Sequence, residues 1–270
     1  MKKVVLFTSD STRHHRLIYL LREVFDEVVA VIEYPETTAP IQGGAADLSR
    51  YFGKLRAAES IIFGDVTQRL DSVDYLRIPY GSLDMHRNII LKRIASSDVV
   101  IVFGASFIRG PLCDALIDRN TVNLHAGISP YYRGSACNFW AQWDKRYDLV
   151  GVTVHALSAG LDSGDIFFHV LPEAAYYNCF EFGFAAIMIA QHALIDALKI
   201  SLPTGWARTK NNNSSEIRYS RISDFEAYQA RTFLAENPTP KTIKQSLAIR
   251  DLELFVRPIV LNCISASSME

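Results

Sequence analysis

Residues 2–35, KKVVLFTSDSTRHHRLIYLLREVFDEVVAVIEYP, contain the pattern that decides the fold. An apolar run from Val4 to Thr8 is followed by a polar segment and by Leu17, Leu20 and Leu21 at helical spacing. A second apolar run covers residues 28–32. Both runs are continuous rather than alternating, which is typical of parallel strands buried on both faces. The sequence therefore predicts a β-α-β unit at the start of the chain.

Strand and helix patterns continue to alternate after this unit. Strands are predicted at 98–103, 121–124, 151–155 and 165–170, and helices at 83–96, 111–117, 137–143 and 180–200. The pattern between 45 and 70 is weakly helical, and the role of residues 35–80 stays open. We expect residues 1–205 to form an open, mostly parallel sheet with helices on both faces. Residues 206–270 are expected to form a small α+β extension with a strand at 217–220 and two short helices.

The composition is that of a globular protein, with 49% hydrophobic and 21% charged residues. Because 28 Lys and Arg balance 29 Asp and Glu, no overall basic field attracts nucleic acid or anionic lipid. No apolar run reaches the ~20 residues of a membrane span, and the N-terminus has no secretory signal pattern. We therefore expect a cytoplasmic protein with no nucleic-acid or membrane partner. Widely spaced cysteines predict reduced thiols and no metal site: Cys113, Cys137, Cys179 and Cys263.

Asn123-Leu124-His125 lies where a predicted strand runs into a loop, the place at which open α/β sheets bind ligands. In a strand Asn123 and His125 point to the same face. A carboxamide and an imidazole side by side can both donate hydrogen bonds to a developing oxyanion. The alternative, that the N-x-H pattern arose by chance and His125 is a packed polar residue, stays open at this point.

Three more motifs follow in order: PYYRG at 130–134, GVT at 151–153 and LDSGDI at 161–166. Together with N-x-H, across residues 98–170, they resemble the formyltransferase family that uses 10-formyltetrahydrofolate. Several linked motifs are a more specific signal than any one of them. The resemblance implies a Rossmann-like formyltransferase fold, with which the initial β-α-β unit agrees. It also implies an enzyme with 10-formyltetrahydrofolate as co-substrate and no metal.

The resemblance implies that Asn123, His125 and Asp162 are catalytic. Asn123 and His125 would donate to the oxyanion. Asp162 would orient His125, raise its pKa by opposite charge and accept or relay the amine proton. Which of the two is the formal base stays open, as does an ordinary Asx-turn role for Asp162. Three other histidines are given no catalytic role: His14, His15 and His155.

In the family, the pterin ring of the folate is bound by backbone groups of a loop and by the loop that carries the catalytic aspartate. Backbone suits this ring because its edge alternates hydrogen-bond donors and acceptors. The cofactor-binding residues that the resemblance implies are Gly104, Ala105, Ser106, Phe107, Ile108, Gly160 and Leu161.

The second substrate has weaker candidates. The start of the first helix is a natural anion site, where Arg13 could contact phosphate, although simple helix capping by Ser11 or Thr12 is an equal alternative. Arg133 more readily braces a loop than contacts substrate. Aromatic residues between 131 and 140 could stack on a base or form core. The substrate-binding candidates are Thr8, Ser9, Asp10, Arg13, Tyr131 and Arg133.

Several acceptors are known in the family, and the chain most resembles its nucleotide-sugar N-formyltransferases. About 60 residues follow Lys210, with seven basic and seven acidic residues from 211 to 270, which disfavours methionyl-tRNA as acceptor. Gly127 and Cys137 stand where the tRNA enzymes usually have serine and proline. The tail also disfavours the shorter glycinamide ribonucleotide enzymes. A formyltransferase for another amine, such as methionyl-tRNA, and a non-catalytic folate- or nucleotide-binding module remain alternatives.

Apolar residues near the C-terminus, Leu252, Leu254, Phe255, Val256, Ile259 and Val260, are expected to pack on the core or on a partner subunit. We favour the partner slightly, which predicts a homodimer formed through the extension.

Overall fold

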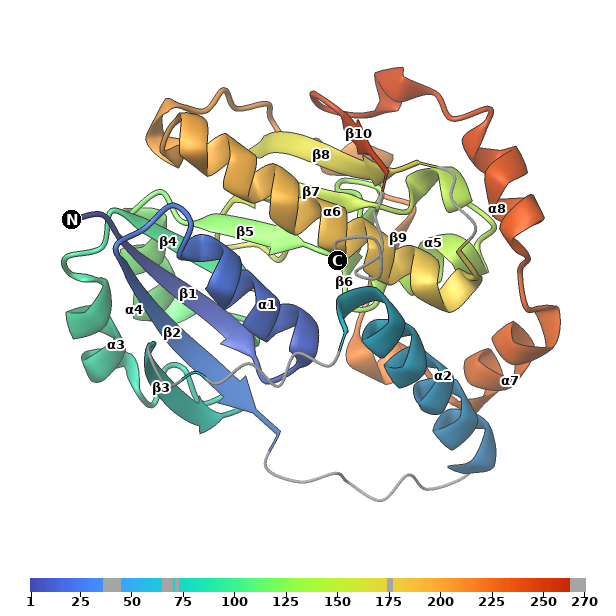
Figure 1. The fold of residues 1–270 in the computed structure, drawn as a ribbon, viewed down its shortest axis with the longest axis horizontal. Helices are drawn as coiled ribbons and strands as arrows, with labels where there is room; N and C mark the ends of the chain where they lie inside the picture. The colour runs from blue at the N-terminus through green and yellow to red at the C-terminus, as the bar shows by residue number, and fades with distance from the viewer. Residues whose placement is uncertain (36–44, 65–69, 71–72, 174–176, 263–270) are drawn as a thin grey trace.

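The computed structural model describes residues 1–35, 45–64, 70, 73–173 and 177–262, and it is built on an eight-stranded sheet (Figure 1). Its order is β10-β8-β7-β5-β4-β1-β2-β3. The strands are β1 (Lys3–Ser9), β2 (Glu27–Tyr34), β3 (Asp74–Pro79), β4 (Val99–Phe103), β5 (Val122–His125), β7 (Val152–Ala156), β8 (Ile166–Pro172) and β10 (Ile259–Leu261). Since β7 pairs antiparallel with both neighbours and the other pairings are parallel, only β7 runs opposite to the rest. The predicted open, mostly parallel sheet is confirmed.

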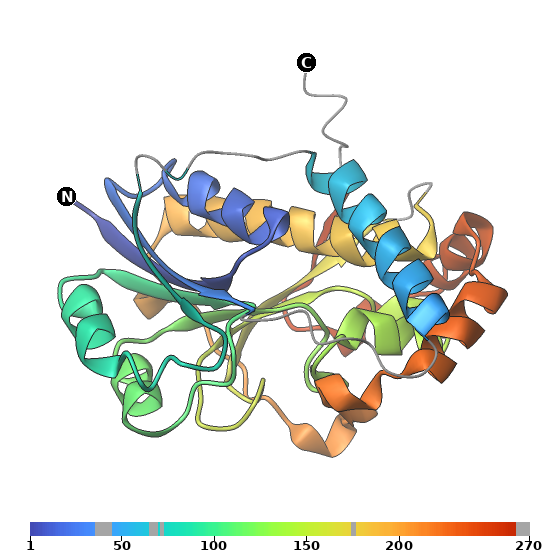
Figure 2. The ribbon, with the colours of Figure 1, turned by 90° about the horizontal axis from the view of Figure 1, so that it is seen from below.

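Helices cover both faces of the sheet, as predicted. On one face lie α1 (Thr12–Leu21), α2 (Ala45–Phe63) and α6 (Cys179–Ile200), and on the other α3 (Arg87–Ile94) and α4 (Gly110–Ile117) (Figure 2). The burial pattern of β1 explains the two layers. Val4 and Leu6 belong to the core under α1 and α6, while Val5 and Phe7 belong to the core under α3 and α4.

Helix α6 is the one helix in the described ranges that is long and apolar enough to cross a membrane by length and composition. In the structure 67% of its most apolar stretch is buried. It packs on β8, α1 and α2 as the central helix of the larger core. Packing inside this chain is therefore enough to explain why α6 is apolar.

Three strands are absent from the prediction. At the sheet edge, β3 buries little beyond Ile78, so its apolar signal is weak. β6 (Tyr132–Gly134) and β10 have three residues each, too few for a periodic pattern. The predicted helix at 83–96 begins only at Arg87, after turns. Cys263 lies outside the described residues.

The tail folds back onto the rest of the chain. β9 (Arg218–Ser220) pairs with β6, α7 (Ala227–Glu236) packs on α2, and α8 (Pro240–Leu247) follows. β10 adds to the edge of the main sheet beside β8. Phe255 is buried in this chain's own core, whereas Leu252 and Leu254 remain 47% and 37% exposed. A boundary at 205/206 stays a prediction, and the extension it defines shares the main sheet.

His169 on β8 connects this tail to the centre of the molecule. Its Nε2 lies 2.9 Å from the Ser129 carbonyl oxygen, and its Nδ1 lies 2.9 Å from the Val256 amide nitrogen. A neutral ring satisfies both contacts, donating from Nε2 and accepting at Nδ1. Burial lowers the pKa of His169 to about 4, so the ring is neutral in the folded protein near pH 7.

This pKa predicts acid sensitivity. As the pH falls below 6.5, the ring becomes protonated in the unfolded protein, whereas in the folded protein it stays neutral down to about pH 4. The free energy of unfolding therefore decreases between pH 6.5 and pH 4. Between pH 6.5 and 5, His169 should lower the free energy of unfolding by about 2 kcal/mol. Urea unfolding at several pH values should therefore show a shallower dependence on pH for His169→Gln than for the wild type. The control is the same comparison at about pH 8, where the folded and the unfolded ring of His169 are both neutral, so that any loss of packing in the variant is measured separately. Equal slopes for His169→Gln and the wild type would contradict the assignment.

Candidate active site

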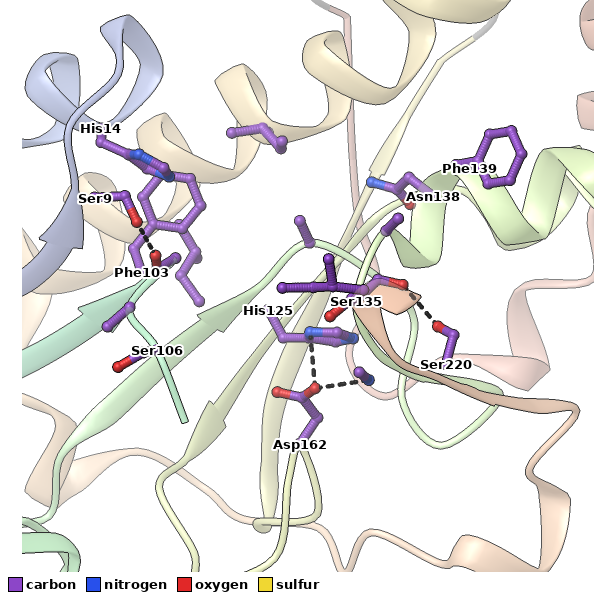
Figure 3. A pocket seen from close by; sticks show the side chains of 18 of the residues that line it. Ser9, His14, Phe103, Ser106, His125, Ser135, Asn138, Phe139, Asp162 and Ser220 are labelled. Atoms are coloured by element: carbon purple, nitrogen blue, oxygen red, sulfur yellow. Dashed lines mark hydrogen bonds and ion pairs between the residues drawn. The ribbon is translucent and has the colours of Figure 1, made fainter. Parts of the chain in front are cut away.

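The site lies where β1, β4 and β5 end, at Ser9, Phe103 and His125. From β1 the chain continues to β2 on one side, while β4 flanks β1 on the other. Such a switch in strand order leaves a crevice beyond the carboxyl ends. A cavity of about 1050 Å³ opens there, and side chains from widely separated segments reach it (Figure 3).

The three predicted catalytic residues come together in the wall of this cavity. Asn123 Nδ2 donates to Asp162 Oδ1 at 3.2 Å, and His125 Nδ1 lies 3.3 Å from Asp162 Oδ2. His125 and Asp162 are each only 7% exposed. Figure 3 shows the Asp162 carboxylate directed at the His125 ring. The geometry is that of one polar cluster at the edge of a large cavity.

Asp162 has a left-handed backbone, with φ of 47°, which is uncommon for a residue with a side chain. The surrounding structure holds it there. Arg133 donates to the Leu161 carbonyl from Nε and Nη2, at 3.0 and 2.6 Å. Ser129 Oγ and Asn211 Nδ2 donate to the carbonyl of Asp162 itself, at 3.2 and 3.0 Å. These contacts fix the direction of the carboxylate.

His155, to which the sequence assigned no role, also belongs to the cluster. It lies on β7 directly opposite Asn123 of β5, at 1% exposure. Its Nδ1 faces the Ala156 carbonyl at 2.8 Å and so carries the hydrogen, which leaves Nε2 to accept from Asn123 Nδ2 at 3.0 Å. The signal that could have revealed His155 is the antiparallel pairing of residues 122–125 with 153–156.

The electrostatics of the pair differ from the expectation in one respect. Burial raises the pKa of Asp162, but its contacts with His125 and His155 and the hydrogen bond from the Gly134 amide outweigh burial and lower the pKa to about 2. For His125, burial lowers the pKa, and the opposing charge of Asp162 does not compensate. Asp162 does raise the pKa of His125 by opposite charge, as predicted, but desolvation of the ring is the larger effect and the net pKa is lowered.

Both nitrogens of His125 face acceptors. Nδ1 faces Asp162, and Nε2 lies 3.1 Å from the Tyr132 carbonyl oxygen. A neutral ring carries one hydrogen and can donate to only one of them. On taking up a proton, the ring would donate to both. Burial keeps His125 neutral beforehand, so the surroundings suit a group that accepts a proton during a reaction.

The loop after His125 requires a glycine. A Cβ on Gly127 would lie 2.4 Å from Cys137 Cβ and 2.6 Å from His125 Nε2, so the serine of the tRNA enzymes has no room here. Thr153 accounts for the GVT motif, because its Oγ1 donates to the Gly127 carbonyl at 2.6 Å and accepts from Ser129 N at 2.9 Å. Buried Thr153 thereby fixes the loop beside His125.

The predicted folate-binding residues all line the cavity: Gly104, Ala105, Ser106, Phe107, Ile108, Gly160 and Leu161. Glu33, at 1% exposure, holds the first of these loops in place. Its carboxylate accepts from Ser106 N at 2.6 Å, from Ser106 Oγ at 2.7 Å and from Gly81 N at 2.7 Å. Glu33 is a positioning residue that the sequence patterns did not reveal.

Only half of the predicted second-substrate residues reach the cavity, namely Ser9, Asp10 and Arg13. The other three side chains bind neighbouring backbone instead, which is a correction. Thr8 Oγ1 donates to the Phe103 carbonyl at 2.8 Å, and Tyr131 OH donates to the Leu254 carbonyl at 3.0 Å. Arg133 braces Leu161, in the structural role that the sequence favoured.

The anion site expected at the start of α1 already holds a carboxylate. Glu59 Oε1 accepts from Arg13 N at 3.2 Å and from Arg13 Nη1 at 2.8 Å. Asp10 pairs with Arg77 Nη2 at 2.6 Å and faces His15 Nε2 at 2.9 Å. A phosphate would therefore have to displace Glu59. Within the described ranges, no group of three or more His, Cys, Asp or Glu side chains could hold a metal ion.

Comparison with solved structures identifies the fold. A sugar N-formyltransferase from a Shewanella species superposes with a TM-score of 0.52 at 18% identity, covering 83% of this chain and 78% of its own. The sugar 3-N-formyltransferase WlaRD, crystallised in the presence of dTDP and 5-N-formyl-tetrahydrofolate, gives 0.51 at 13% identity, covering 84% and 72%. Phosphoribosylglycinamide formyltransferase from Bacillus halodurans gives 0.50 at 19%, covering 73% and 93%. No family model and no curated protein sequence matches the chain. The fold is thus the α/β fold of the formyltransferases.

Proposed function

We propose that this chain is an N-formyltransferase that moves the formyl group of 10-formyltetrahydrofolate to the amine of a nucleotide-linked amino-deoxy sugar. The observation that carries the proposal is the buried cluster of Asn123, His125 and Asp162 in the wall of the cavity, beside the loop 104–108. Surface-polysaccharide synthesis, including that of lipopolysaccharide O-antigen, is the process that uses such sugars, and a cytoplasmic location would suit it. Homodimerisation through the tail stays a prediction.

The cavity fits the folate co-substrate. Its volume of about 1050 Å³ is at the upper end for small-molecule sites, as two substrates require. Loop 104–108 offers backbone donors and acceptors to a pterin, and Glu33 holds that loop rigid. A formyl group attached to folate in this loop would lie toward Asn123 and His125, which line the same cavity.

In the reaction the sugar amine forms a C–N bond to the formyl carbon, and the bond from that carbon to the folate nitrogen breaks. Asn123 Nδ2 would stabilise the negative charge that develops on the formyl oxygen. Its two hydrogens now bind His155 and Asp162, so one contact must yield when the substrate enters. His155 keeps the carboxamide in the required orientation.

The amine proton would pass to His125 and then to the departing folate nitrogen, which balances the transfer. His125 is the better base, because at a pKa of about 2 Asp162 is too weakly basic near pH 7. Asp162 would instead stabilise the imidazolium by charge and by the contact at Nδ1. We therefore propose His125, and not Asp162, as the base.

Features of the cavity favour a nucleotide-linked acceptor. Away from the catalytic cluster its wall is aromatic, with Tyr51, Phe139, Phe180 and Phe233. Arg221 lines the cavity, and exposed Lys54, outside the lining, has its Nζ 5.8 Å from the ring centroid of Phe180. In the part of the chain that the structure describes, neither cation forms an ion pair with a carboxylate. An arginine without an ion pair, in a cavity that also has an aromatic wall, suits a diphosphate joined to a base.

Arg221→Gln should raise the KM for the nucleotide sugar by about tenfold and leave kcat and the KM for folate unchanged, because a charge-assisted contact to phosphate is lost. Steady-state kinetics at low salt checks this. Arg231→Gln, which removes an exposed arginine of α7 outside the cavity, is the matched control. An unchanged acceptor KM for Arg221→Gln would exclude Arg221 as a phosphate ligand.

The proposal itself is tested by incubating the protein with 10-formyltetrahydrofolate and a panel of acceptors while following the release of tetrahydrofolate. The panel contains nucleotide amino sugars, glycinamide ribonucleotide and methionyl-tRNA. We expect release only with an amino sugar. Release with methionyl-tRNA or glycinamide ribonucleotide instead would replace the acceptor assignment. Tight folate binding without turnover would indicate a binding module.

A further inference from the structure

Helix α5 (Cys137–Trp143) presents two buried amide side chains to the cavity. Asn138 is 8% exposed and Gln142 4%, and both line the cavity. Asn138 Nδ2 and Gln142 Oε1 are buried atoms without a hydrogen-bond partner. Every other such atom in the described ranges belongs to a residue outside the cavity wall. Because an unpaired buried polar group costs free energy, these two point to a missing ligand.

The orientation of each amide follows from its other contact. Asn138 Oδ1 accepts from Gly151 N at 3.0 Å, which leaves Nδ2 as the free group. Gln142 Nε2 donates to the Asn138 carbonyl at 3.1 Å, which leaves Oε1 free. The pair therefore offers one donor and one acceptor on successive turns of one helix. Figure 3 shows the nitrogen of Asn138 directed into the cavity, away from Phe139.

The pair lies close to the reacting centre. Cys137, which precedes Asn138, packs against Gly127, and Gly127 lies against His125 Nε2. Gly183 of α6 also lies near Asn138, since a Cβ at Gly183 would be in ordinary van der Waals contact with Asn138 Cβ, at 3.6 Å. His125, the aromatic wall and both amides line the same cavity, so the amides belong to the same binding site as His125. In the proposed reaction the ligand group beside His125 is the sugar, because the sugar carries the amine.

We propose that Asn138 and Gln142 are specificity-determining residues for the sugar of the acceptor. They would select a sugar with a substituent that both accepts and donates a hydrogen bond, a hydroxyl or an acylamino group near the formylated amine. Its oxygen would accept from Asn138 Nδ2, and its O–H or N–H would donate to Gln142 Oε1. This inference rests on the proposed function. A sugar without that substituent leaves both amides unpaired.

The test compares acceptors that differ only in this substituent. Nucleotide amino sugars with a hydroxyl, an acetamido group or hydrogen beside the amine are assayed with the wild type, Asn138→Asp and Gln142→Met. Asn138→Asp retains the acceptor for Gly151 N and removes the free donor, and Gln142→Met keeps the length of the side chain. The wild type should prefer one of the substituted sugars over the deoxy sugar by at least about tenfold in kcat/KM.

Each variant should lose about tenfold or more on the preferred sugar and change little on the deoxy sugar, with the KM for folate unchanged. The preferred substituent identifies the group as hydroxyl or acylamino. Equal activity of wild type and both variants on all sugars, or equal losses on all of them, would overturn the assignment while the proposed function stands. If the wild type formylates no amino sugar in the panel, both the proposed function and this inference fall.

Discussion

Asp162→Asn and His125→Ala are each expected to lower formyl transfer by about 10² or more, the usual loss when a group that stabilises transition-state charge is removed. Asp162→Asn keeps the shape of the side chain but removes the charge that stabilises protonated His125 at 3.3 Å. His125→Ala removes the proton acceptor itself. Turnover at saturating substrates is the measurement, with thermal unfolding and folate binding to confirm that the fold persists.

Asp165→Asn is the matched control for these variants. Asp165 follows in the same segment, pairs with Lys210 at 3.4 Å and lies outside the cavity wall. Its substitution should leave turnover within about twofold of the wild type, since surface ion pairs contribute little. Full activity in Asp162→Asn or His125→Ala would contradict the proposed roles, and an equal loss in Asp165→Asn would mean that the whole loop had been disturbed.

Gly164→Ala is expected to destabilise the protein by about 3 kcal/mol and to reduce activity with it. A Cβ at this position would lie 1.7 Å from the Ala156 carbonyl oxygen. That oxygen belongs to the β7 backbone. The Ala156 peptide is held in place there because Ala156 N donates to the Asp165 carbonyl at 2.9 Å. The strand or the loop must therefore move, which displaces Asp162 from His125.

Gly160→Ala provides the comparison within the same loop. There a Cβ would meet Ser163 Oγ at 2.4 Å, the end of a short side chain that can rotate away. Its cost should stay below about 1 kcal/mol. Urea unfolding of both variants measures the difference. Equal stability of Gly164→Ala and Gly160→Ala would show that the loop does not need the close approach at Gly164.

Much of the site could be predicted because the strands that carry Asn123 and His125 follow from local sequence patterns. Continuous apolar runs place the ends of β1, β4 and β5, and alternation along β5 puts Asn123 and His125 on one face. Asp162 could not be derived in this way. Its approach to His125 depends on a left-handed backbone held by Ser129, Arg133 and Asn211 from distant segments. Linked motifs, rather than periodicity, identified it.

The residues that the sequence did not reveal share a different cause. His155 acts through its antiparallel pairing with Asn123, and Glu33 acts through a loop 73 residues later in the chain. Asn138 and Gln142 differ from ordinary helix residues only because their free atoms face a cavity. The depressed pKa of His125 depends on burial, which sequence spacing does not reveal. Each depends on tertiary packing.

The most direct test of the central claim is mass spectrometry of the acceptor after incubation with the wild type and 10-formyltetrahydrofolate. The acceptors are thymidine-, guanosine- and uridine-diphosphate amino sugars, with Asp162→Asn as the negative control. We predict that one of them gains a single formyl group on its amine, at least about 10²-fold more slowly with the variant than with the wild type. No formylated sugar from a folded wild-type protein that binds folate would contradict the proposed function.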